Sequence, residues 1–394
     1  MRFFIVCPAY VVTGGTELLH QLSLQLSTRG VENYMLYTGV EPGISPTPDA
    51  FMKYQVKHTT YFVDHRTSVL IVPETLIEMI DQCKKGKKVI WWLSADNYLS
   101  NYSDEIQRQG KVDIFGLSEN TNILHFAQSK YAAEFVKKQF GVKEPYFLGD
   151  YINDEIRKTA IQYNGSLLRG NICLYNPRKG EENLRDIRDR CREDIQWIPL
   201  QGMKPDQMAM LMCRAKVYID FGSHRGKDRI PREAAVCGCC IITNREGSAM
   251  YAEDVGIPEK YKIADMLDCD RVLRVIYDLV DNYSERVVEY EEYVTSILEE
   301  KAQFERETDA MLGIVSADDV FSAPEWKESR YDNMMGNLRT LADRVGMCYE
   351  NAMALYAVQD IDFAIKELLK VEGYLSMLRE AGYAMICDML SDEE

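Results

Sequence analysis

The sequence predicts an α/β protein made of two doubly wound, Rossmann-like domains followed by a C-terminal helical extension. Two series of short apolar strands alternate with amphipathic helices, a pattern typical of parallel sheets covered on both faces. Beyond about residue 265 the pattern becomes wholly helical. The 394 residues also exceed what one hydrophobic core usually serves and suit two domains of ordinary size.

The first domain is expected over residues 1–160. It opens with an apolar strand at 2–7, a loop that contains Gly14 and Gly15, and a helix whose leucines fall mostly on one side. Strand 33–39 completes this first βαβ unit. The pattern continues with strands at 68–72, 88–94 and 123–129 and with helices at 74–85 and 130–141. Residues 151–170 join the two domains.

The second domain is expected over residues 170–265. Its strands are predicted at 171–176, 195–200, 216–222 and 239–243, and its helices at 181–193, 206–215 and 231–237. Pro231 fits the first position of the last of these helices, and Gly238 fits its end.

Crossover helices are expected over 266–320 and a helical hairpin over 325–394. This hairpin resembles one tetratricopeptide-like unit. Because a repeat array needs several units, we favour a capping or dimerising hairpin, which would support a homodimer or a hetero-complex.

Composition narrows the class of protein. The net charge of −16 argues against a surface for nucleic acid but allows a local basic pocket for phosphate. The eleven cysteines are scattered through apolar runs, which indicates buried reduced thiols rather than disulfides or zinc ligands. The N-terminus lacks the features of a signal peptide, and no run approaches a membrane span. We therefore expect a cytoplasmic protein, whose near-neutral first half would make any peripheral contact with the inner membrane.

Two strand-to-helix loops are candidate anion sites. The stretch PAYVVTGGTE (8–17) places Gly14 and Gly15 where glycine can adopt positive φ and where backbone N–H groups can approach an anion. A purely structural turn is the alternative. The stretch LYNPRKG (174–180) offers Arg178 and Lys179, whose guanidinium and ammonium groups suit phosphate oxygens, although a solvated turn would have the same composition.

A third candidate is FGSHRGKDRIPRE (221–233), which gathers charged residues after a predicted strand. Arg225, Lys227 and Arg229 could face a phosphate, and Glu233, in the first turn of the helix expected at 231–237, could accept two sugar hydroxyls. A solvated loop and a helix-start carboxylate without a ligand are the alternatives.

Taken in order, these motifs resemble the GT-B fold glycosyltransferases, in particular the retaining family 4 group. The resemblance rests on the glycine pair followed by Glu17, the K-G loop at 179–180, and P-x-E-A-x-x-x-G at 231–238. The passages AQSKYAAEFVKKQFGV and FLGDYINDEI resemble that group's domain junction, so the similarity covers roughly residues 1–310.

The resemblance implies a glycosyltransferase in GT-B arrangement that takes a sugar from a nucleotide diphosphate sugar, with no other cofactor and no metal. Arg178 and Lys179 would contact the diphosphate and Glu233 the ribose, while the first domain would bind a glycan, lipid-linked or protein acceptor. Transfer would be retaining and would serve surface polysaccharide or glycoconjugate synthesis. The implied donor-binding residues are Gly14, Gly15, Arg178, Lys179, Gln201, Gly202, His224, Lys227, Arg229 and Glu233.

The chain also departs from the family. Arg225 stands where the first residue of the family's paired-Glu motif is expected, and Asp228 could replace that residue only in a remodelled loop. The stretch WWLSADNY lacks the family's His, which leaves Asp96 as the candidate base. Leu174 stands where the family has an Arg, so that Arg178 would fill its role. The candidate catalytic residues are therefore Asp96, Arg225 and Asp228.

Two accounts fit these departures. In the first, the segment HRGKDR selects a different sugar or a sugar carboxylate. In the second, transfer is lost and the chain is a non-catalytic partner that stabilises an active transferase. We favour the first account because the phosphate-facing residues are kept while the sugar-facing ones change.

Overall fold

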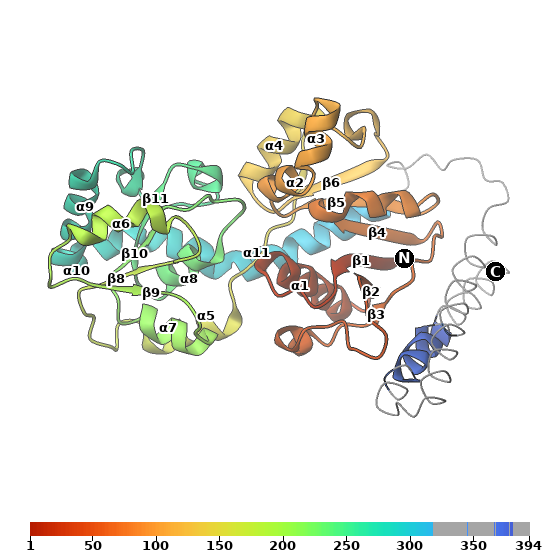
Figure 1. The fold of residues 1–394 in the computed structure, drawn as a ribbon, viewed down its shortest axis with the longest axis horizontal. Coiled ribbons are helices and arrows are strands. Elements are labelled where there is room, and N and C mark those ends of the chain that lie inside the picture. The colour runs from red at the N-terminus through yellow and green to blue at the C-terminus, as the bar shows by residue number, and fades with distance from the viewer. Residues whose placement is uncertain (318–344, 346–365, 367, 378, 381–394) are drawn as a thin grey trace, which may run out of the picture. The chain divides into compact units, whose positions relative to one another are not determined.

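The chain folds into two parallel β-sheets whose strands are connected by helices (Figure 1). This computed structural model describes residues 1–317, 345, 366, 368–377, 379 and 380. Its contacts divide the chain into two compact units. The first unit comprises Met1–Ile90, Asn120–Leu124 and the described residues from Leu312 onward, and the second comprises Trp91–Glu119 and His125–Met311. The predicted α/β class with two Rossmann-like sheets is confirmed.

The first sheet has seven strands in the order β3-β2-β1-β4-β5-β6-β7. Chain progression therefore reverses between β1 and β4, as in other doubly wound sheets. The strands are β1 (Arg2–Pro8), β2 (Glu32–Thr38), β3 (His58–Thr59), β4 (Ser68–Pro73), β5 (Lys87–Trp92), β6 (Ile123–Ala127) and β7 (Tyr146–Phe147).

Helix α1 (Gly14–Thr28) begins one residue after Thr13, whose side chain caps it. Thr13 and Thr16 form a reciprocal capping box that satisfies donors at the helix start. Gly14 and Gly15 are thus the first two helical residues, and neither has the positive φ that the sequence allowed; within this loop Tyr10 has it instead, with φ of 64°. Gly14 and Gly15 therefore do not form a left-handed turn.

The segment after β4 differs from the predicted helix at 74–85. It forms the 3-10 turns η2 (Glu74–Gln82), interrupted at Leu76 by φ of −135°. Shortly after η2 the chain turns at residues 84–86, whose backbone N–H groups donate to the carboxylate of Asp64. That turn ends the segment before a regular helix can extend.

Two short helices that the sequence did not predict follow β5. They are α2 (Ala95–Asn101) and α3 (Ser103–Gln109). No residue of α3 is buried, so the segment has no apolar periodicity to reveal it. The other helices of this half are η1 (Asp49–Tyr54), η3 (Leu117–Glu119) and α4 (Lys130–Phe140).

The second sheet has five parallel strands in the order β12-β11-β10-β8-β9. The chain runs from β8 outward to β9 and then returns to the other side of β8, so the switch point lies between β8 and β10. The strands are β8 (Ile172–Tyr175), β9 (Gln196–Pro199), β10 (Val217–Asp220), β11 (Cys240–Asn244) and β12 (Lys262–Ile263).

Helices cover both faces of this second sheet. Figure 1 shows α6 (Glu181–Asp189) and α9 (Cys269–Asp281) on one face, while α5 (Asp154–Tyr163), α7 (Pro205–Met212) and α8 (Arg229–Val236) pack together on the other. Helix α5 lies inside the predicted linker, and its Ile156 and Ala160 belong to the same core as β10 and β11. All nine cysteines among the described residues are free, as the sequence predicted.

Helix α8 starts earlier than the predicted helix at 231–237. It begins at Arg229, so Pro231 is its third residue rather than its first. That position tolerates proline because the first turn of a helix has no internal acceptor for its N–H groups. Glu233 consequently lies in the second turn, whereas Gly238, with φ of +88°, directly follows the C-cap Cys237 as predicted.

The chain continues with further helical segments, which ends the α/β pattern where the sequence predicted. These segments follow α9 and are α10 (Tyr283–Arg286), η6 (Val287–Tyr290) and α11 (Glu291–Ser316). The 3-10 turns η4 (Gly247–Met250) and η5 (Glu259–Tyr261) lie earlier, between β11 and β12. The predicted hairpin at 325–394 falls largely outside the described residues, of which 366, 368–377, 379 and 380 are helical. Within the described part of the chain, no helix is long and apolar enough to cross a membrane.

Candidate functional site

The switch point of the second sheet is built by two loops in close contact. Gly180, with φ of +67°, ends the loop after β8, and a Cβ added to it would lie 2.3 Å from the carbonyl oxygen of Phe221. A Cβ added to Gly222, in the loop after β10, would lie 2.6 Å from the Cβ of Lys179. Only glycine permits this approach at both positions. The K-G pair predicted at 179–180 therefore brings its loop against the end of β10.

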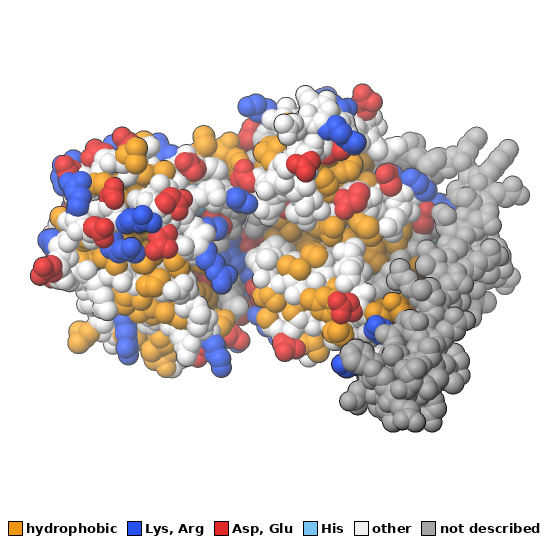
Figure 2. All heavy atoms as spheres, viewed as in Figure 1, with side chains coloured by type: hydrophobic (Ala, Val, Ile, Leu, Met, Phe, Trp, Pro, Cys, Tyr) orange, Lys and Arg blue, Asp and Glu red, His pale blue; other side chains and the backbone are white. Residues whose placement is uncertain are grey.

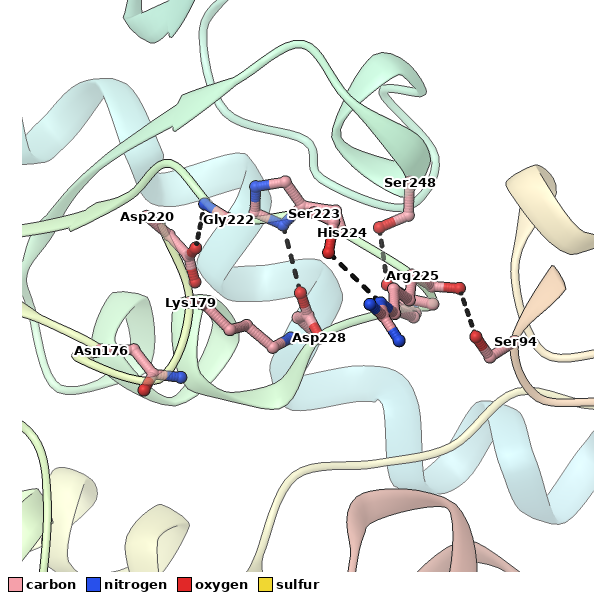
Figure 3. Close-up of polar contacts among 12 residues, drawn as sticks. Ser94, Asn176, Lys179, Asp220, Gly222, Ser223, His224, Arg225, Asp228 and Ser248 are labelled. Carbon is pink, nitrogen blue, oxygen red and sulfur yellow. Dashed lines mark hydrogen bonds and ion pairs between the residues drawn. The ribbon is translucent and has the colours of Figure 1, made fainter. Parts of the chain in front are cut away.

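Lys179 and Asp228 meet across this contact. The Lys179 ammonium donates to Oδ1 of Asp228 at 2.6 Å, and both side chains are partly buried (Figure 3). Lys179 lies at the start of α6, and Asp228 occupies the N-cap position of α8. Helix N-termini and a lysine at a switch point are the elements that α/β proteins use to bind phosphate.

Two further polar side chains lie behind this pair. Asp220 is the last residue of β10, and its carboxylate accepts hydrogen bonds from the Gly222 N–H at 3.0 Å and from the Tyr218 hydroxyl at 2.8 Å. The fully buried His224 has Nδ1 3.2 Å from Oδ2 of Asp228 (Figure 3). One ligand atom from each of Asp220, His224 and Asp228 lies within 4.8 Å of the others.

The loop after β11 supports the same cluster from a third side. A Cβ added to Gly247 would lie 2.0 Å from the carbonyl oxygen of His224, which also accepts from the Ser248 N–H at 2.8 Å. The Ser248 hydroxyl donates to the carbonyl of Gly226 at 2.6 Å. The segment 221–228, which we call the 221–228 loop, is therefore held by the loops after β8 and β11 together.

Arg225 leaves the cluster and is exposed. Its carbonyl accepts a hydrogen bond of 2.8 Å from the Ser94 hydroxyl, and Gly226 approaches so closely that an added Cβ would lie 2.6 Å from the Leu93 carbonyl oxygen. Asp96, two residues from Ser94, accepts from the Tyr131 hydroxyl at 3.0 Å. Partial burial raises the pKa of Asp96, and this effect outweighs the opposing hydrogen bond from Tyr131 and the charge of Arg225. The structure thus brings two of the three predicted catalytic residues, Asp96 and Arg225, near each other.

Lys227 and Arg229 face a buried ion-pair network. Lys227 pairs with Glu300 at 2.9 Å, and Arg229 pairs with Asp150 at 3.3 Å. Arg232, which is fully buried, joins both carboxylates at 2.6 Å and 2.8 Å respectively. Burial by itself raises the pKa of Asp150, but the charges of Arg232 and Arg229 outweigh it and lower that pKa to about 2.

A donor phosphate would therefore compete with Glu300 for Lys227 and with Asp150 for Arg229. A polar cavity of about 250 Å³ lies beside this network, lined in part by Lys227, Glu300, Tyr293 and Arg306. The assignment of Lys227 and Arg229 to the donor stays a prediction.

The remaining predicted donor residues lie at several places. Arg178 is exposed in the loop after β8, and Gln201 and Gly202 are exposed at the carboxyl end of the neighbouring strand β9. Glu233 is buried within α8. Gly14 and Gly15 belong to the first unit and lie at the carboxyl end of β1.

Sequence reasoning missed Asp220 and Ser248. Asp220 is a carboxylate at the end of the otherwise apolar strand VYID, and a buried charge at that end of a parallel strand is a signal that could have identified it. Ser248 has no such signal, because its role depends on how the loop after β11 packs on His224.

Surface charge is mixed on the face that Figure 2 shows. Lys and Arg side chains of the described residues lie among Asp and Glu side chains there, without a continuous basic stripe.

Two doubly wound parallel sheets with these strand orders define the GT-B fold class, and solved structures agree. The chain is similar to Alr3699/HepE of Anabaena in complex with UDP-glucose, with a TM-score of 0.54, 11% identity and coverage of 80% of this chain and 100% of that one. It is also similar to a trehalose-6-phosphate synthase studied with bisubstrate glycomimetics, with a TM-score of 0.53, 8% identity and coverage of 82% and 100%. Both are GT-B glycosyltransferases.

No protein-family model matches this chain, and no curated protein matches it. The likeness to the two glycosyltransferases is therefore one of fold.

Proposed function

We propose that this protein transfers a sugar from a nucleotide diphosphate sugar to an acceptor hydroxyl. The observation that carries the proposal is Lys179, which lies at the start of α6 beside the switch point of the second sheet. Ligands of doubly wound sheets bind at this place, and a lysine beside a helix N-terminus suits a diphosphate. Exposed Arg178, one residue earlier, adds a second cation to the same loop.

The chemistry follows from the charge that develops on the leaving group. The acceptor oxygen forms a bond to the anomeric carbon, the bond from that carbon to the phosphate oxygen breaks, and the diphosphate leaves with the electron pair. Fixed cations and backbone N–H groups at the α6 start would stabilise this negative charge. The acceptor oxygen attacks on the face from which the phosphate leaves, so the anomeric configuration is retained, and the acceptor proton passes to the leaving phosphate oxygen. This route requires neither a separate base nor a metal in contact with the donor.

The fold neighbours support the donor class. The Anabaena HepE structure contains UDP-glucose, and the same class of donor would fit a phosphate site at α6 with the base toward Gln201 and Gly202. We further propose, from the resemblance, that the acceptor is a glycan or lipid-linked saccharide of a surface polysaccharide or glycoconjugate.

A ligand screen tests the proposal. Thermal shift with UDP-, GDP- and ADP-sugars should identify at least one donor that raises the melting temperature, whereas CMP-sugars, which carry one phosphate, should have a smaller effect. If no sugar nucleotide stabilises the protein at millimolar concentration, the donor assignment is wrong. Asp96→Ala should leave donor binding intact and lower turnover if Asp96 assists the acceptor.

A second candidate function is a non-catalytic partner of an active glycosyltransferase. It is favoured by Arg225 in place of the expected glutamate and by Lys227 and Arg229, which carboxylates already balance. This candidate predicts co-purification with another glycosyltransferase and no turnover by the chain alone. Native mass measurement of the isolated complex distinguishes the two functions.

A further inference from the structure

Three ionisable side chains of the 221–228 loop and strand β10 converge in the interior. Asp220 and His224 have exposed fractions of 2% and 0%, and the Asp228 side chain is 18% exposed. Their spacing in the chain is Asp-x3-His-x3-Asp. Among the described residues, Lys179 is the only cation that forms an ion pair with these side chains. When the imidazole is neutral, the two carboxylates and the one ammonium group therefore leave a net buried charge of about −1.

Several atoms of this cluster have no hydrogen-bond partner among the described residues. They are Nδ1 and Nε2 of His224 and Oδ2 of Asp228, all of which are inaccessible to solvent. Nδ1 and Oδ2 lie 3.2 Å apart, within ion-pair range, but they do not meet hydrogen-bond geometry. Buried polar atoms without partners are costly, and a bound ion is one of the few explanations for them.

We propose that Asp220, His224 and Asp228 bind a divalent transition-metal ion. The 3.2 Å between Nδ1 and Oδ2 suits two ligands of one ion. Metal–ligand bonds of about 2.1 Å place neighbouring ligands about 3.0 Å apart in an octahedron and about 3.4 Å apart in a tetrahedron. No pair of ligand atoms in the cluster exceeds 4.8 Å, so small side-chain movements close the site.

The donor set and its surroundings indicate the class of ion. One imidazole nitrogen with two carboxylate oxygens suits Zn²⁺ or Mn²⁺ better than Mg²⁺, which prefers oxygen ligands and water. Both carboxylates are oriented by outer hydrogen bonds, Asp220 by Tyr218 and Gly222 and Asp228 by Lys179. Such outer partners are typical of metal ligands in proteins.

The ion would hold the 221–228 loop from within. His224 and Asp220 are closed to solvent, so the ion would lie behind Lys179 rather than in the phosphate site, and the transfer chemistry proposed above would still involve no metal in contact with the donor. The inference does not depend on sugar transfer, since the three ligands can be tested without a nucleotide.

Mn²⁺ binding to the full chain tests this inference, because Mn²⁺ has little affinity for the buried thiols. After chelator treatment, the loss of the free-ion EPR signal should titrate to one Mn²⁺ per chain, and Zn²⁺ should displace it. Asp220→Asn, His224→Asn and Asp228→Asn should each weaken binding at least about tenfold. His58→Asn, which replaces an exposed histidine, should bind as the wild type does.

Folding of each variant is checked by far-UV circular dichroism. The result for Asp228→Asn decides the test, because Asp228 is the most exposed of the three residues and its replacement should disturb folding least. The inference is overturned if neither ion binds saturably at millimolar concentration, or if folded Asp228→Asn binds with wild-type affinity. Absence of metal binding together with an imidazolium signal from His224 in NMR would instead define a proton-sharing cluster.

Discussion

The Ser94 hydroxyl donates a hydrogen bond of 2.8 Å to the carbonyl of Arg225. Both positions depart from the family that the chain resembles, because Ser94 lies in a stretch without the expected histidine and Arg225 stands in place of an expected glutamate. The hydrogen bond joins these two positions directly. The close approach of Gly226 to Leu93 is part of the same contact.

Ser94→Ala should lower the free energy of unfolding by about 1 kcal/mol, because the carbonyl of Arg225 loses its donor and α2 loses its capping side chain. Urea denaturation measures the change. Ser103→Ala, at an exposed position at the start of α3, is the control and should have no more than a marginal effect. Equal stability of the two variants would contradict a supporting role for Ser94.

Lys179→Ala should weaken binding of the donor found in the screen by about tenfold or more, because a charge-assisted hydrogen bond contributes about 1.5–3 kcal/mol. Isothermal titration calorimetry measures the affinity. Lys138→Ala removes an exposed lysine of α4 and should leave affinity unchanged. If Lys179→Ala bound the donor with wild-type affinity, the placement of the phosphate site at the start of α6 would be wrong.

A comparison of Gly180→Ala with Gly202→Ala distinguishes the cost of a left-handed backbone conformation from the cost of a steric clash between the new Cβ and its neighbours. Both glycines have nearly the same φ, +67° and +66°, but only Gly180 has a neighbour that a Cβ would strike. Gly202→Ala should cost about 1–2 kcal/mol from the left-handed conformation alone. Gly180→Ala should cost more than about 3 kcal/mol and abolish donor binding. Similar stabilities in thermal denaturation would show that the two loops can separate freely.

Arg232→Met should destabilise the protein by about 3–5 kcal/mol, because it leaves the carboxylates of Asp150 and Glu300 with less compensation in the interior. The control is Arg2→Met, which breaks an ion pair of 2.9 Å with the more exposed Glu32 and should cost less than about 1 kcal/mol. Denaturant midpoints compare them. A small effect of Arg232→Met would mean that the network adds little to stability.

Acid should destabilise the protein through His125. Burial lowers the pKa of His125 to about 4, and its Nδ1 accepts from the Trp92 indole at 3.0 Å. Between pH 6.5 and 4 the unfolded chain binds a proton that the folded protein does not, so stability falls with pH by up to about 3 kcal/mol. In His125→Asn, the free energy of unfolding should depend less on pH between pH 6.5 and 4.

Burial also lowers the pKa of His20, which adds a contribution of the same sign. The informative quantity is therefore the difference between wild type and His125→Asn in urea midpoints at pH 7.5, 5.5 and 4.5. Parallel curves would show that folding does not lower the pKa of His125.

Local patterns predicted the sheets and the K-G loop, because the apolar strands and Gly180 act on their immediate neighbours. They could not predict the partners of Lys227 and Arg229, since Glu300 and Asp150 lie more than seventy residues away in the chain. The start of α8 was placed two residues late because proline is acceptable anywhere in a first turn. Asp220 went unnoticed because a single acid in an apolar strand leaves the strand pattern intact.

The contact between Gly247 and the His224 carbonyl limits how the 221–228 loop can be exchanged by protein engineering and how it can change in evolution. The loops after β8, β10 and β11 touch through glycine and shared hydrogen bonds, so HRGKDR cannot be replaced by itself with the corresponding loop of another GT-B protein. A working chimera would have to carry residues 176–180 and 245–248 along with it. Natural change of this region should accordingly occur as coordinated replacement of all three segments, and sequences that share HRGKDR should share Gly180, Gly222 and Gly247.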